Sequence, residues 1–421
     1  MRATIFTNVR IFDGTGTPPF AGEVVVEAER ITAVRRQGEP EPSPMPDAER
    51  IDGRGATIMP GLVEAHAHLT WPSSVERFVP GMTLPPDDLA LNTARNARIL
   101  LDHGFTSAYS GGALGKVIEV ALKAAIDSGG LPGPRLVPSS IEREPPSTNE
   151  VLAGGRVEAH GAGPEAIRAF VKECAGFGAK VVKFLLSGES ALQPGASMRL
   201  LYTDAEAQAA GEEASASNVW LTGHAHAADA VKMGLRHGFR VLYHCTYADA
   251  EAIDLLEAHK AVIFVAPSVG IVQATLDAKP PPHFDMSHMK QDAEIVLERQ
   301  SRLVPELKKR GVRILPGGDY GFPFNPNGRN ARDLELFIRH FGFTPIDALI
   351  AATKLGGEIM GMGAELGQIK PGYLADVLLV DGDPTQAVAI LQDPNKLLAI
   401  MKNGRFHKPP PSMRSPAYST P

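Results

Sequence analysis

Residues 59–68 read Met59-Pro60-Gly61-Leu62-Val63-Glu64-Ala65-His66-Ala67-His68, an apolar run with a Pro-Gly pair that ends in two histidines. In an extended strand, a spacing of two residues places both imidazoles on the same face. Neutral imidazole is the commonest protein ligand for metals. The stretch therefore predicts a strand whose carboxyl end supplies half of a metal site. An isolated His-x-His is equally compatible with two ordinary strand-end histidines, so residues elsewhere have to decide.

Downstream of this stretch, short apolar runs alternate with segments of helical periodicity as far as about residue 365. Seven further runs read as strands: 106–109, 135–138, 180–185, 219–222, 240–243, 261–265 and 312–315. Helical segments lie between them: 89–103, 115–128, 164–176, 204–217, 225–236, 248–259 and 292–310. Eight strands separated by helices favour parallel pairing with right-handed crossovers. The predicted class is α/β, and the predicted architecture is a (β/α)8 TIM barrel.

Strand-like runs also open and close the chain, at 4–12 and 22–34 and again at 366–372, 375–380 and 398–405. We therefore expect both chain ends to pair into one small β-sandwich domain, made of residues 1–57 and 366–407. The barrel would then comprise residues 58–365. Residues 408–421 are rich in proline and predict an extended or disordered arm.

Composition excludes several classes of protein. Among 421 residues, 43% are hydrophobic and 21% charged, which is typical of a globular protein. A net charge of -6 leaves no basic surplus to neutralise phosphates, so we expect no nucleic-acid partner. Only Cys174 and Cys245 are present, too few for a disulfide framework. With no signal-peptide pattern and no apolar stretch long enough to cross a bilayer, the sequence predicts a cytoplasmic protein without a membrane partner.

Residues of metal-ligand type gather where the predicted barrel strands end, which is where the active sites of such barrels lie. Each alone has an ordinary explanation, such as a hydrogen-bonded core histidine, an outward-facing lysine or an aspartate that caps a turn. Together, at one rim of one barrel, they favour a shared site. These residues are His66 and His68 after the first strand, Lys183 in the fourth, His224 after the fifth, His244 after the sixth and Asp319 after the eighth.

With these residues in place, the chain resembles the amidohydrolase superfamily, in the branch with a two-metal site. The resemblance runs from the apolar entry at 59–63 to the segment Gly367-Gln368-Ile369-Lys370-Pro371-Gly372-Tyr373-Leu374-Ala375-Asp376 near the end of the chain. It implies two divalent metal ions, for which zinc fits the histidine-rich, oxygen-bridged ligand set best, with manganese or cobalt as alternatives. The implied ligands are His66, His68 and Asp319 for one metal ion, His224 and His244 for the other, and Lys183, as N6-carboxylysine, between the two.

Carboxylation of Lys183 makes physical sense at such a site. A carbamate converts a buried cation into an anion with two oxygens, which suits two adjacent dications that an ammonium would repel. Water bound to such metals loses its proton near pH ~7. The resemblance therefore implies hydrolysis through a hydroxide shared by the two metals. Asp319 would be the catalytic proton shuttle, taking the proton on attack and giving it to the leaving nitrogen.

Within that superfamily, the chain looks most like the metal-dependent dipeptidase and carboxypeptidase group that includes ochratoxin-hydrolysing amidases. The segments that carry this likeness are 317–336 and 342–353. Many of those relatives have Gly-Gly-His after the third strand, where this chain reads Ser139-Ser140-Ile141-Glu142-Arg143. We therefore expect hydrolysis of an amide C–N bond in a small molecule, such as an N-acyl amino acid, a dipeptide-like compound or an aromatic amide.

Candidate contacts to that small-molecule substrate lie beside the implied ligands and in neighbouring loops. The long segment 267–291 is expected to be a loop that serves as a lid or as a subunit contact of a homo-oligomer. Trp71, Phe78 and Met82 favour an aromatic substrate. The candidate substrate contacts are His226, Tyr243, Arg329 and His288.

Two other functions compete with amide hydrolysis. The first is an aminohydrolase that deaminates an aromatic or heterocyclic amine. Deaminases of this superfamily usually use one metal and a nearby glutamate, whereas the fifth strand here offers His224-Ala225-His226 without a glutamate. The second is a non-catalytic scaffold, which would be expected to lose ligands that this chain retains. Metal content discriminates among the three: two ions, one ion or none.

Overall fold

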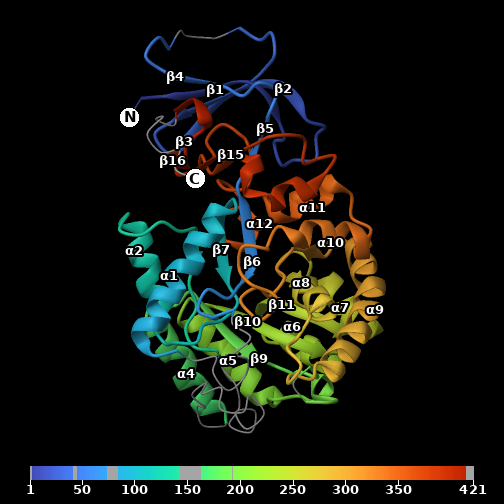
Figure 1. The fold of residues 1–421 in the computed structure, drawn as a ribbon. Coiled ribbons are helices and arrows are strands. Elements are labelled where there is room, and N and C mark those ends of the chain that lie inside the picture. The colour runs from blue at the N-terminus through green and yellow to red at the C-terminus, as the bar shows by residue number, and fades with distance from the viewer. Residues whose placement is uncertain (1, 41–44, 74–83, 143–162, 192, 414–421) are drawn as a thin grey trace.

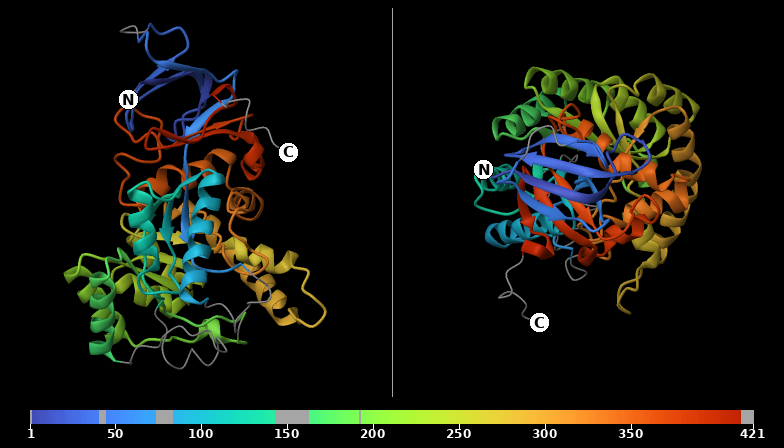
Figure 2. Two further views of the ribbon diagram at one scale, coloured as in Figure 1. Left: turned by 60° about the vertical axis from the view of Figure 1, so that its left-hand side comes forward. Right: turned by 90° about the horizontal axis from the view of Figure 1, so that it is seen from above.

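The computed structural model describes residues 2–40, 45–73, 84–142, 163–191 and 193–413. A sheet built from both chain ends lies at one end of the molecule, above a larger body of parallel strands and helices (Figure 1). Seen along the axis from that sheet to the body, helices lie around the outside (Figure 2). None of the helices in these ranges is both long and apolar enough to span a bilayer.

The first and last strands of the chain share one sheet, as expected. Within it, β14 pairs antiparallel with β5, so that Leu378 lies opposite Met59. The sandwich form and the division into domains stay predictions. Residues 366–372, expected to be a strand, form turns instead, and the Ile369 amide donates to the Asp13 carbonyl at 3.1 Å. The strands of this sheet are β1 (Thr4–Ile11), β2 (Phe20–Glu27), β3 (Arg30–Arg36), β4 (Glu49–Asp52), β5 (Thr57–Pro60), β14 (Val377–Val380), β15 (Leu397–Lys402) and β16 (Arg405–Lys408).

Within the described ranges, eight parallel strands form the body in two sheets, a TIM-barrel-like α/β arrangement. Two isolated parallel bridges link the sheets, one between Ser139 and Val181 and one between Ala67 and Tyr320. Among the described residues no continuous ladder closes the ring. The first sheet comprises β6 (Leu62–Ala67), β7 (Phe105–Ser110) and β8 (Arg135–Val137), and the second β9 (Val181–Leu185), β10 (Trp220–Ala227), β11 (Phe239–Tyr247), β12 (Phe264–Ala266) and β13 (Arg313–Ile314).

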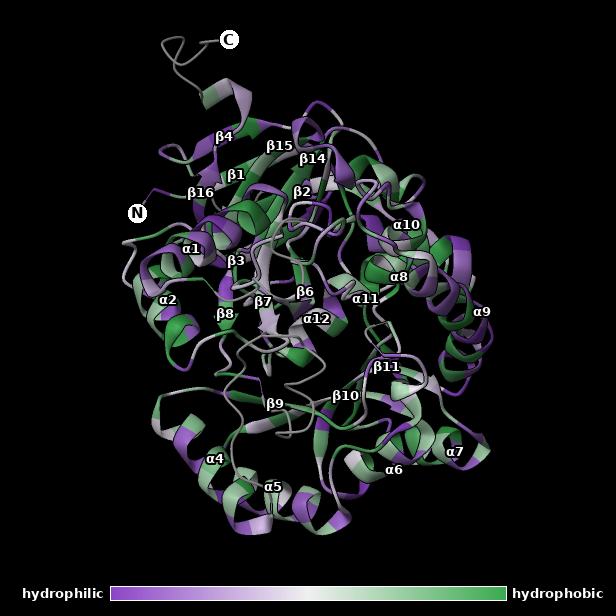
Figure 3. Ribbon diagram, turned by 60° about the horizontal axis from the view of Figure 1, so that its bottom comes forward, coloured by the Kyte–Doolittle hydropathy of each residue, from purple (hydrophilic) through white to green (hydrophobic). Residues whose placement is uncertain are grey.

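The helices pack apolar faces on these strands and turn polar faces outward (Figure 3). In α1, which packs on β7, Ala97, Leu100 and Leu101 are buried at helical spacing. The helices are α1 (Pro86–Asp102), α2 (Ile118–Asp127), α4 (Pro164–Gly176), α5 (Asp204–Ala216), α6 (Ala228–Arg236), α7 (Ala250–Ala258), α8 (Val269–Asp277), α9 (Ser287–Lys309), α10 (Arg332–Phe341), α11 (Pro345–Ala352) and α12 (Lys354–Ile359). Short 3-10 turns are η2 (Ala196–Met198), η3 (Val388–Gln392), η4 (Pro394–Lys396) and η5 (Pro411–Met413).

Gly61 separates two strands that the sequence predicts as one. The run from about Ala56 to His66 is divided into β5, in the sheet of chain ends, and β6, in the body. At this transition the backbone passes so close to Thr106 that a Cβ on Gly61 would lie 2.1 Å from Thr106 Oγ1. Only glycine permits this approach, which feeds β6 into the body and points its carboxyl end toward the histidines.

The prediction of a loop at 267–291 is wrong for much of this segment. Helix α8 occupies Val269–Asp277, and α9 already begins at Ser287, before the predicted start at 292. Val269 is fully buried and Val272 is 7% exposed, so the apolar residues of this segment stabilise a packed helix. The sequence of α8 is largely apolar, as a buried helix requires, but the prolines at 267 and 280–282 on either side of it favour a loop.

Candidate metal centre

The first group of candidate ligands comes from the carboxyl ends of β6 and of the strand-eight region. His66 and His68 leave β6 on one side, and Asp319 follows β13. Their ligand atoms lie within 4.8 Å of one another, and all three residues are buried. Asp319 Oδ1 is 2.9 Å from His68 Nε2 and 3.8 Å from His66 Nε2. The structure therefore brings these three side chains together.

The other ring nitrogens of these two histidines contact neighbouring elements. His66 Nδ1 lies 3.0 Å from Ser268 Oγ, and His68 Nδ1 lies 3.3 Å from the Gly112 carbonyl oxygen. Such contacts fix the orientation of a ligand histidine and leave its second nitrogen for the metal. In both residues Nε2 is the nitrogen that faces Asp319.

A second group comes from the adjacent strands β10 and β11. His224, His226 and His244 are buried, and their ligand atoms also lie within 4.8 Å of one another. Parallel pairing places Ala225 opposite His244, so histidines of both strands reach the same rim. The rings of His226 and His244 stack with centroids 4.4 Å apart.

Lys183 lies beside the first group, and its charge also acts on His224 and His244 of the second. It is 1% exposed, and its side chain points toward the ligands: Nζ lies 3.5 Å from His66 Nε2 and donates to the Gly111 carbonyl at 2.8 Å. Nζ also lies 4.5 Å from the centre of the Tyr243 ring. The strand register explains this placement. β9 pairs with β10 so that Lys183 lies opposite Thr222, two residues before His224 and on the same face of the sheet.

The backbone is strained at this rim. His244, Asp319 and Ser268 have φ angles of 70°, 60° and 62°, in the left-handed region that non-glycine residues seldom adopt. Asn325 stabilises the turn around Asp319, because its Nδ2 donates to the carbonyls of Gly318 and Asp319 at 2.9 Å each. Strain of this kind concentrates at functional sites, where the surrounding structure has to enforce it.

Burial sets the protonation state of the histidines. It lowers the pKa of His66 and His244 well below the ordinary value, and that of His224 to about 3. These imidazoles are therefore neutral near pH 7, which is the form that binds metal. Burial raises the pKa of Asp319, but its interactions with His66, His68 and Lys183 together outweigh this effect and lower the pKa overall, so Asp319 is anionic.

The donor set fits divalent cations. His244 Nε2 is buried and has no hydrogen-bond partner among the described residues, and the buried Asp319 Oδ1 faces His68 Nε2 at 2.9 Å. Buried polar atoms normally have partners, and a cation at each group of ligands would supply one. Neutral imidazoles with one carboxylate are the ligands that zinc and related metals prefer.

The four candidate substrate contacts lie at different distances from this centre. His226 belongs to the second group, with Nδ1 2.9 Å from Thr246 Oγ1 and Nε2 3.1 Å from Glu189 Oε2. Tyr243 is fully buried, stacks on His66 at 3.4 Å and donates its hydroxyl to the Ala65 carbonyl at 3.0 Å. Its contacts therefore support the metal ligands and leave no hydroxyl for a substrate.

The other two candidates lie outside the ligand cluster. His288 Nε2 contacts the Ser190 carbonyl oxygen at 2.6 Å, next to Glu189. Arg329 is exposed and has no contact with the candidate ligands among the described residues. Trp71 lies beside the centre, 4.1 Å from the His68 ring, whereas Phe78 and Met82 fall outside the described residues.

Two acidic residues at the rim were not predicted as site residues. Glu142, from the segment after β8, lies 3.3 Å from Lys183 Nζ through Oε1. Glu189, after β9, lies 3.1 Å from His226 and 3.8 Å from His224. Burial raises the pKa of Glu189, but the charge and hydrogen bond of His226, with the charge of His224 and the Ala191 amide, together outweigh it and lower the pKa to about 2. Only their position in the sequence could have indicated these two residues, because both glutamates follow the carboxyl ends of parallel strands of the body.

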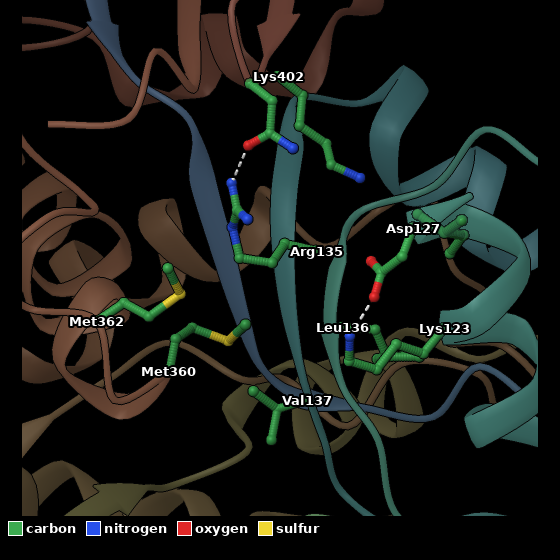
Figure 4. Close-up of a pocket in the computed structure, with 10 residues that line it drawn as sticks. Lys123, Asp127, Arg135, Leu136, Val137, Met360, Met362 and Lys402 are labelled. Carbon is green, nitrogen blue, oxygen red and sulfur yellow. Dashed lines mark hydrogen bonds and ion pairs between the residues drawn. The ribbon is translucent and has the colours of Figure 1, made fainter. Parts of the chain in front are cut away.

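A cavity of about 490 Å³ lies elsewhere, where β8 meets α2, β15 and the segment after α12 (Figure 4). Its polar lining includes Arg135, which pairs with Asp376 at 3.2 Å, and Lys402, which donates to the Gly133 carbonyl at 2.6 Å. Arg135 is the first residue of β8, so the cavity opens at the amino end of the strands. None of the candidate ligands lines it.

Comparisons with known proteins agree with this geometry. A family model described as "Amidohydrolase family" matches residues 57–406. Ochratoxinase of Aspergillus niger is 26% identical over 380 residues, which covers 85% of this chain and 77% of the ochratoxinase. Its crystal structure superposes with a TM-score of 0.81 at 22% identity, covering 97% of this chain and 96% of that one. A Xaa-Pro dipeptidase superposes with a TM-score of 0.83 at 21% identity, covering 96% and 100%. At these identities the solved structures support the fold alone.

Proposed function

Because the chain belongs to the amidohydrolase family, we propose that it is a metal-dependent hydrolase of an amide C–N bond in a small molecule. N-acyl amino acids, dipeptide-like compounds and aromatic amides are the proposed substrate classes. The observation that carries the proposal is the convergence of two groups of buried residues, with the ligand atoms of each group within 4.8 Å of one another and with Lys183 Nζ 3.5 Å from His66.

We assign one cation to His66, His68 and Asp319 and a second to His224 and His244. Lys183, carboxylated on Nζ, would bridge them. As a free ammonium 3.5 Å from His66 Nε2, this lysine would repel a cation on that histidine. As a carbamate it becomes an anion that attracts both cations. Two divalent ions held by these residues would supply Lewis acidity toward the carbonyl group and would lower the pKa of bound water. Zinc is the proposed metal.

The chain's own residues then move the proton and position the reacting groups. Asp319 is an anion with one carboxylate oxygen directed at the ligands, so it can take a proton from the attacking water. It then gives that proton to the leaving nitrogen. Tyr243 stacks on His66 and holds the ring in place, and Trp71 limits access of bulk water to His68.

Deamination of an aromatic amine is a second candidate, and one contact favours it. The fifth strand carries no glutamate, but Glu189 from the neighbouring segment lies 3.1 Å from His226 and 3.8 Å from His224. A carboxylate there could carry protons for a centre with one metal ion. The retained Lys183 favours the two-metal hydrolase instead.

The test is a panel of N-acyl amino acids, aryl amides and aromatic amines, with divalent metals measured in the same preparation. We expect release of a carboxylic acid and an amine, together with two metal ions per chain. Release of ammonia from an aromatic amine, with one metal ion per chain, would favour deamination. A chain that binds no divalent metal would overturn both enzymatic proposals.

A further inference from the structure

Glu142 is held in place at the rim by backbone pairing between two segments that follow β7 and β8. Ala113 bridges to Ile141, the Glu142 amide donates to the Ala113 carbonyl at 3.1 Å, and the Ala113 amide donates to the Ser140 carbonyl at 3.1 Å. Glu142 is 9% exposed as a whole. Its carboxylate therefore has a defined position at the mouth of the site.

Two glycines keep the space beside this carboxylate free of side chains. A Cβ on Gly112, where φ is +121°, would lie 3.4 Å from Glu142 Cβ and 3.2 Å from Lys183 Cγ. A Cβ on Gly111 would lie 2.2 Å from His66 Cδ2. The two residues after β7 therefore contribute backbone only, and no side chain of theirs separates Glu142 from the candidate ligands.

The charge partner of Glu142 changes if Lys183 is carboxylated. At present the lysine ammonium lies 3.3 Å from Glu142 Oε1 and is the one basic group in contact with it within the described ranges. Conversion of that ammonium into a carbamate would leave a buried carboxylate facing another anion. A buried charge without a partner is costly. Glu142 would thereby lose the donor that now faces Oε1, and that oxygen would be free to accept a hydrogen bond from a cationic group of the substrate.

A metal ion is the less suitable partner. The two groups of ligand atoms that lie within 4.8 Å of one another in the described structure include neither oxygen of Glu142. Glu189 adds a second carboxylate close to the candidate ligands, 3.1 Å from His226 and 3.8 Å from His224. Carboxylates beside the site favour a ligand that carries positive charge.

We propose that Glu142 determines specificity by accepting a protonated amine of the substrate. The preferred substrate is then an amide that carries a free amino group close to the bond that is cleaved. This inference rests on the proposed hydrolase function and on the carbamate at Lys183. It also explains why this chain differs from relatives with Gly-Gly-His after the third strand. The segment here contains Glu142, and an acidic residue favours a cationic group on the substrate.

The experiment compares wild-type enzyme with Glu142→Gln on a pair of substrates, an aminoacyl arylamide and its N-acetylated form. A charged hydrogen bond of ordinary strength corresponds to about 10–100-fold in binding. We expect Glu142→Gln to lower kcat/KM for the free amine by about that factor, mainly through KM, and to leave the N-acetylated form within about threefold. Glu165→Gln, at a side chain that is 93% exposed, is the matched control and should change neither substrate.

Two further measurements separate this role from others. Calorimetry with phenylalaninol and N-acetylphenylalaninol tests amine binding without turnover, and only wild type should prefer the free amine. Metal analysis of Glu142→Gln should give the wild-type content. Three results for Glu142→Gln would each overturn the proposal: an equal loss of kcat/KM on both substrates, phenylalaninol binding as tight as in wild type, or loss of a metal ion. If wild type hydrolyses neither substrate but binds phenylalaninol through Glu142, the hydrolase proposal fails and amine recognition stands.

Discussion

At the scale of single residues, the centre depends on side chains whose charge state is set by burial. His66, His224 and His244 are neutral because their surroundings disfavour the imidazolium form, and Asp319 remains an anion despite its burial. The strained backbone at His244 and Asp319 shows that the fold holds these groups where local preference would not. Both features indicate a site built to receive positive charge.

Lys183→Ala tests the bridging role directly. We expect activity to disappear, because the variant can form no carbamate between the two ligand groups, and a short carboxylic acid such as propionate should restore part of it. Steady-state hydrolysis with and without propionate is the measurement. Lys180→Ala is the control, since that nearby amine instead donates to the Asn218 carbonyl at 2.6 Å. Undiminished turnover in Lys183→Ala would argue against the bridge.

Asp319→Asn separates proton transfer from metal binding. The amide keeps one oxygen for a cation but cannot take up a proton, so kcat should fall by about 100-fold or more. Metal content should stay at the wild-type value. Asp229→Asn, at a side chain that is 72% exposed, should behave as wild type in both measurements. A variant at position 319 that keeps its kcat would contradict the proton-shuttle role.

At the scale of secondary-structure elements, tight backbone passages decide how strands deliver these residues. Gly61 is the clearest case, because it separates β5 from β6 at the contact with Thr106. Gly61→Ala should lower the free energy of unfolding by about 1–3 kcal/mol, the usual effect of overpacking. Denaturant unfolding measures it. Gly176→Ala, where a Cβ would meet nothing within 4 Å, should be neutral within about 0.5 kcal/mol; equal stability of the two variants would contradict the packing argument.

Glu119 links α2 to the segment after β8 and makes stability depend on pH. It is fully buried, accepts a hydrogen bond from the Ser139 amide at 2.9 Å, and burial raises its pKa to about 8. Between the ordinary pKa of 4.5 and about 8, the folded chain keeps a proton here that the unfolded chain has released. The contribution of Glu119 to the free energy of unfolding therefore falls as pH rises through that window. Above a pH of about 8 it falls no further.

Glu119→Gln should remove this contribution. Between pH 5.5 and 7.5, unfolding of wild type should release about one proton more than unfolding of the variant. The measurement is the slope of unfolding free energy against pH for each protein, with Glu165→Gln as the exposed control. Parallel slopes for wild type and Glu119→Gln would show that the carboxyl group is already ionised in the folded chain.

At the scale of the whole molecule, the sequence predicted the parallel strands, the pairing of both chain ends and the convergence of six candidate ligands. Histidines at strand ends and a lysine inside an apolar run can be recognised from the sequence alone. The break at Gly61 was missed because it depends on contact with Thr106, which is distant in sequence. Glu142 and Glu189 were missed because each lies in a loop whose course only tertiary structure defines.

The central claim is that these six side chains hold a pair of cations. Diffraction from crystals of the purified protein, recorded at the absorption edge of its metal, tests it most directly. We predict two anomalous peaks per chain, one among His66, His68 and Asp319 and one beside His224 and His244, with density for a carbamate on Lys183. A single peak, or an unmodified Lys183 beside two metals, would contradict it.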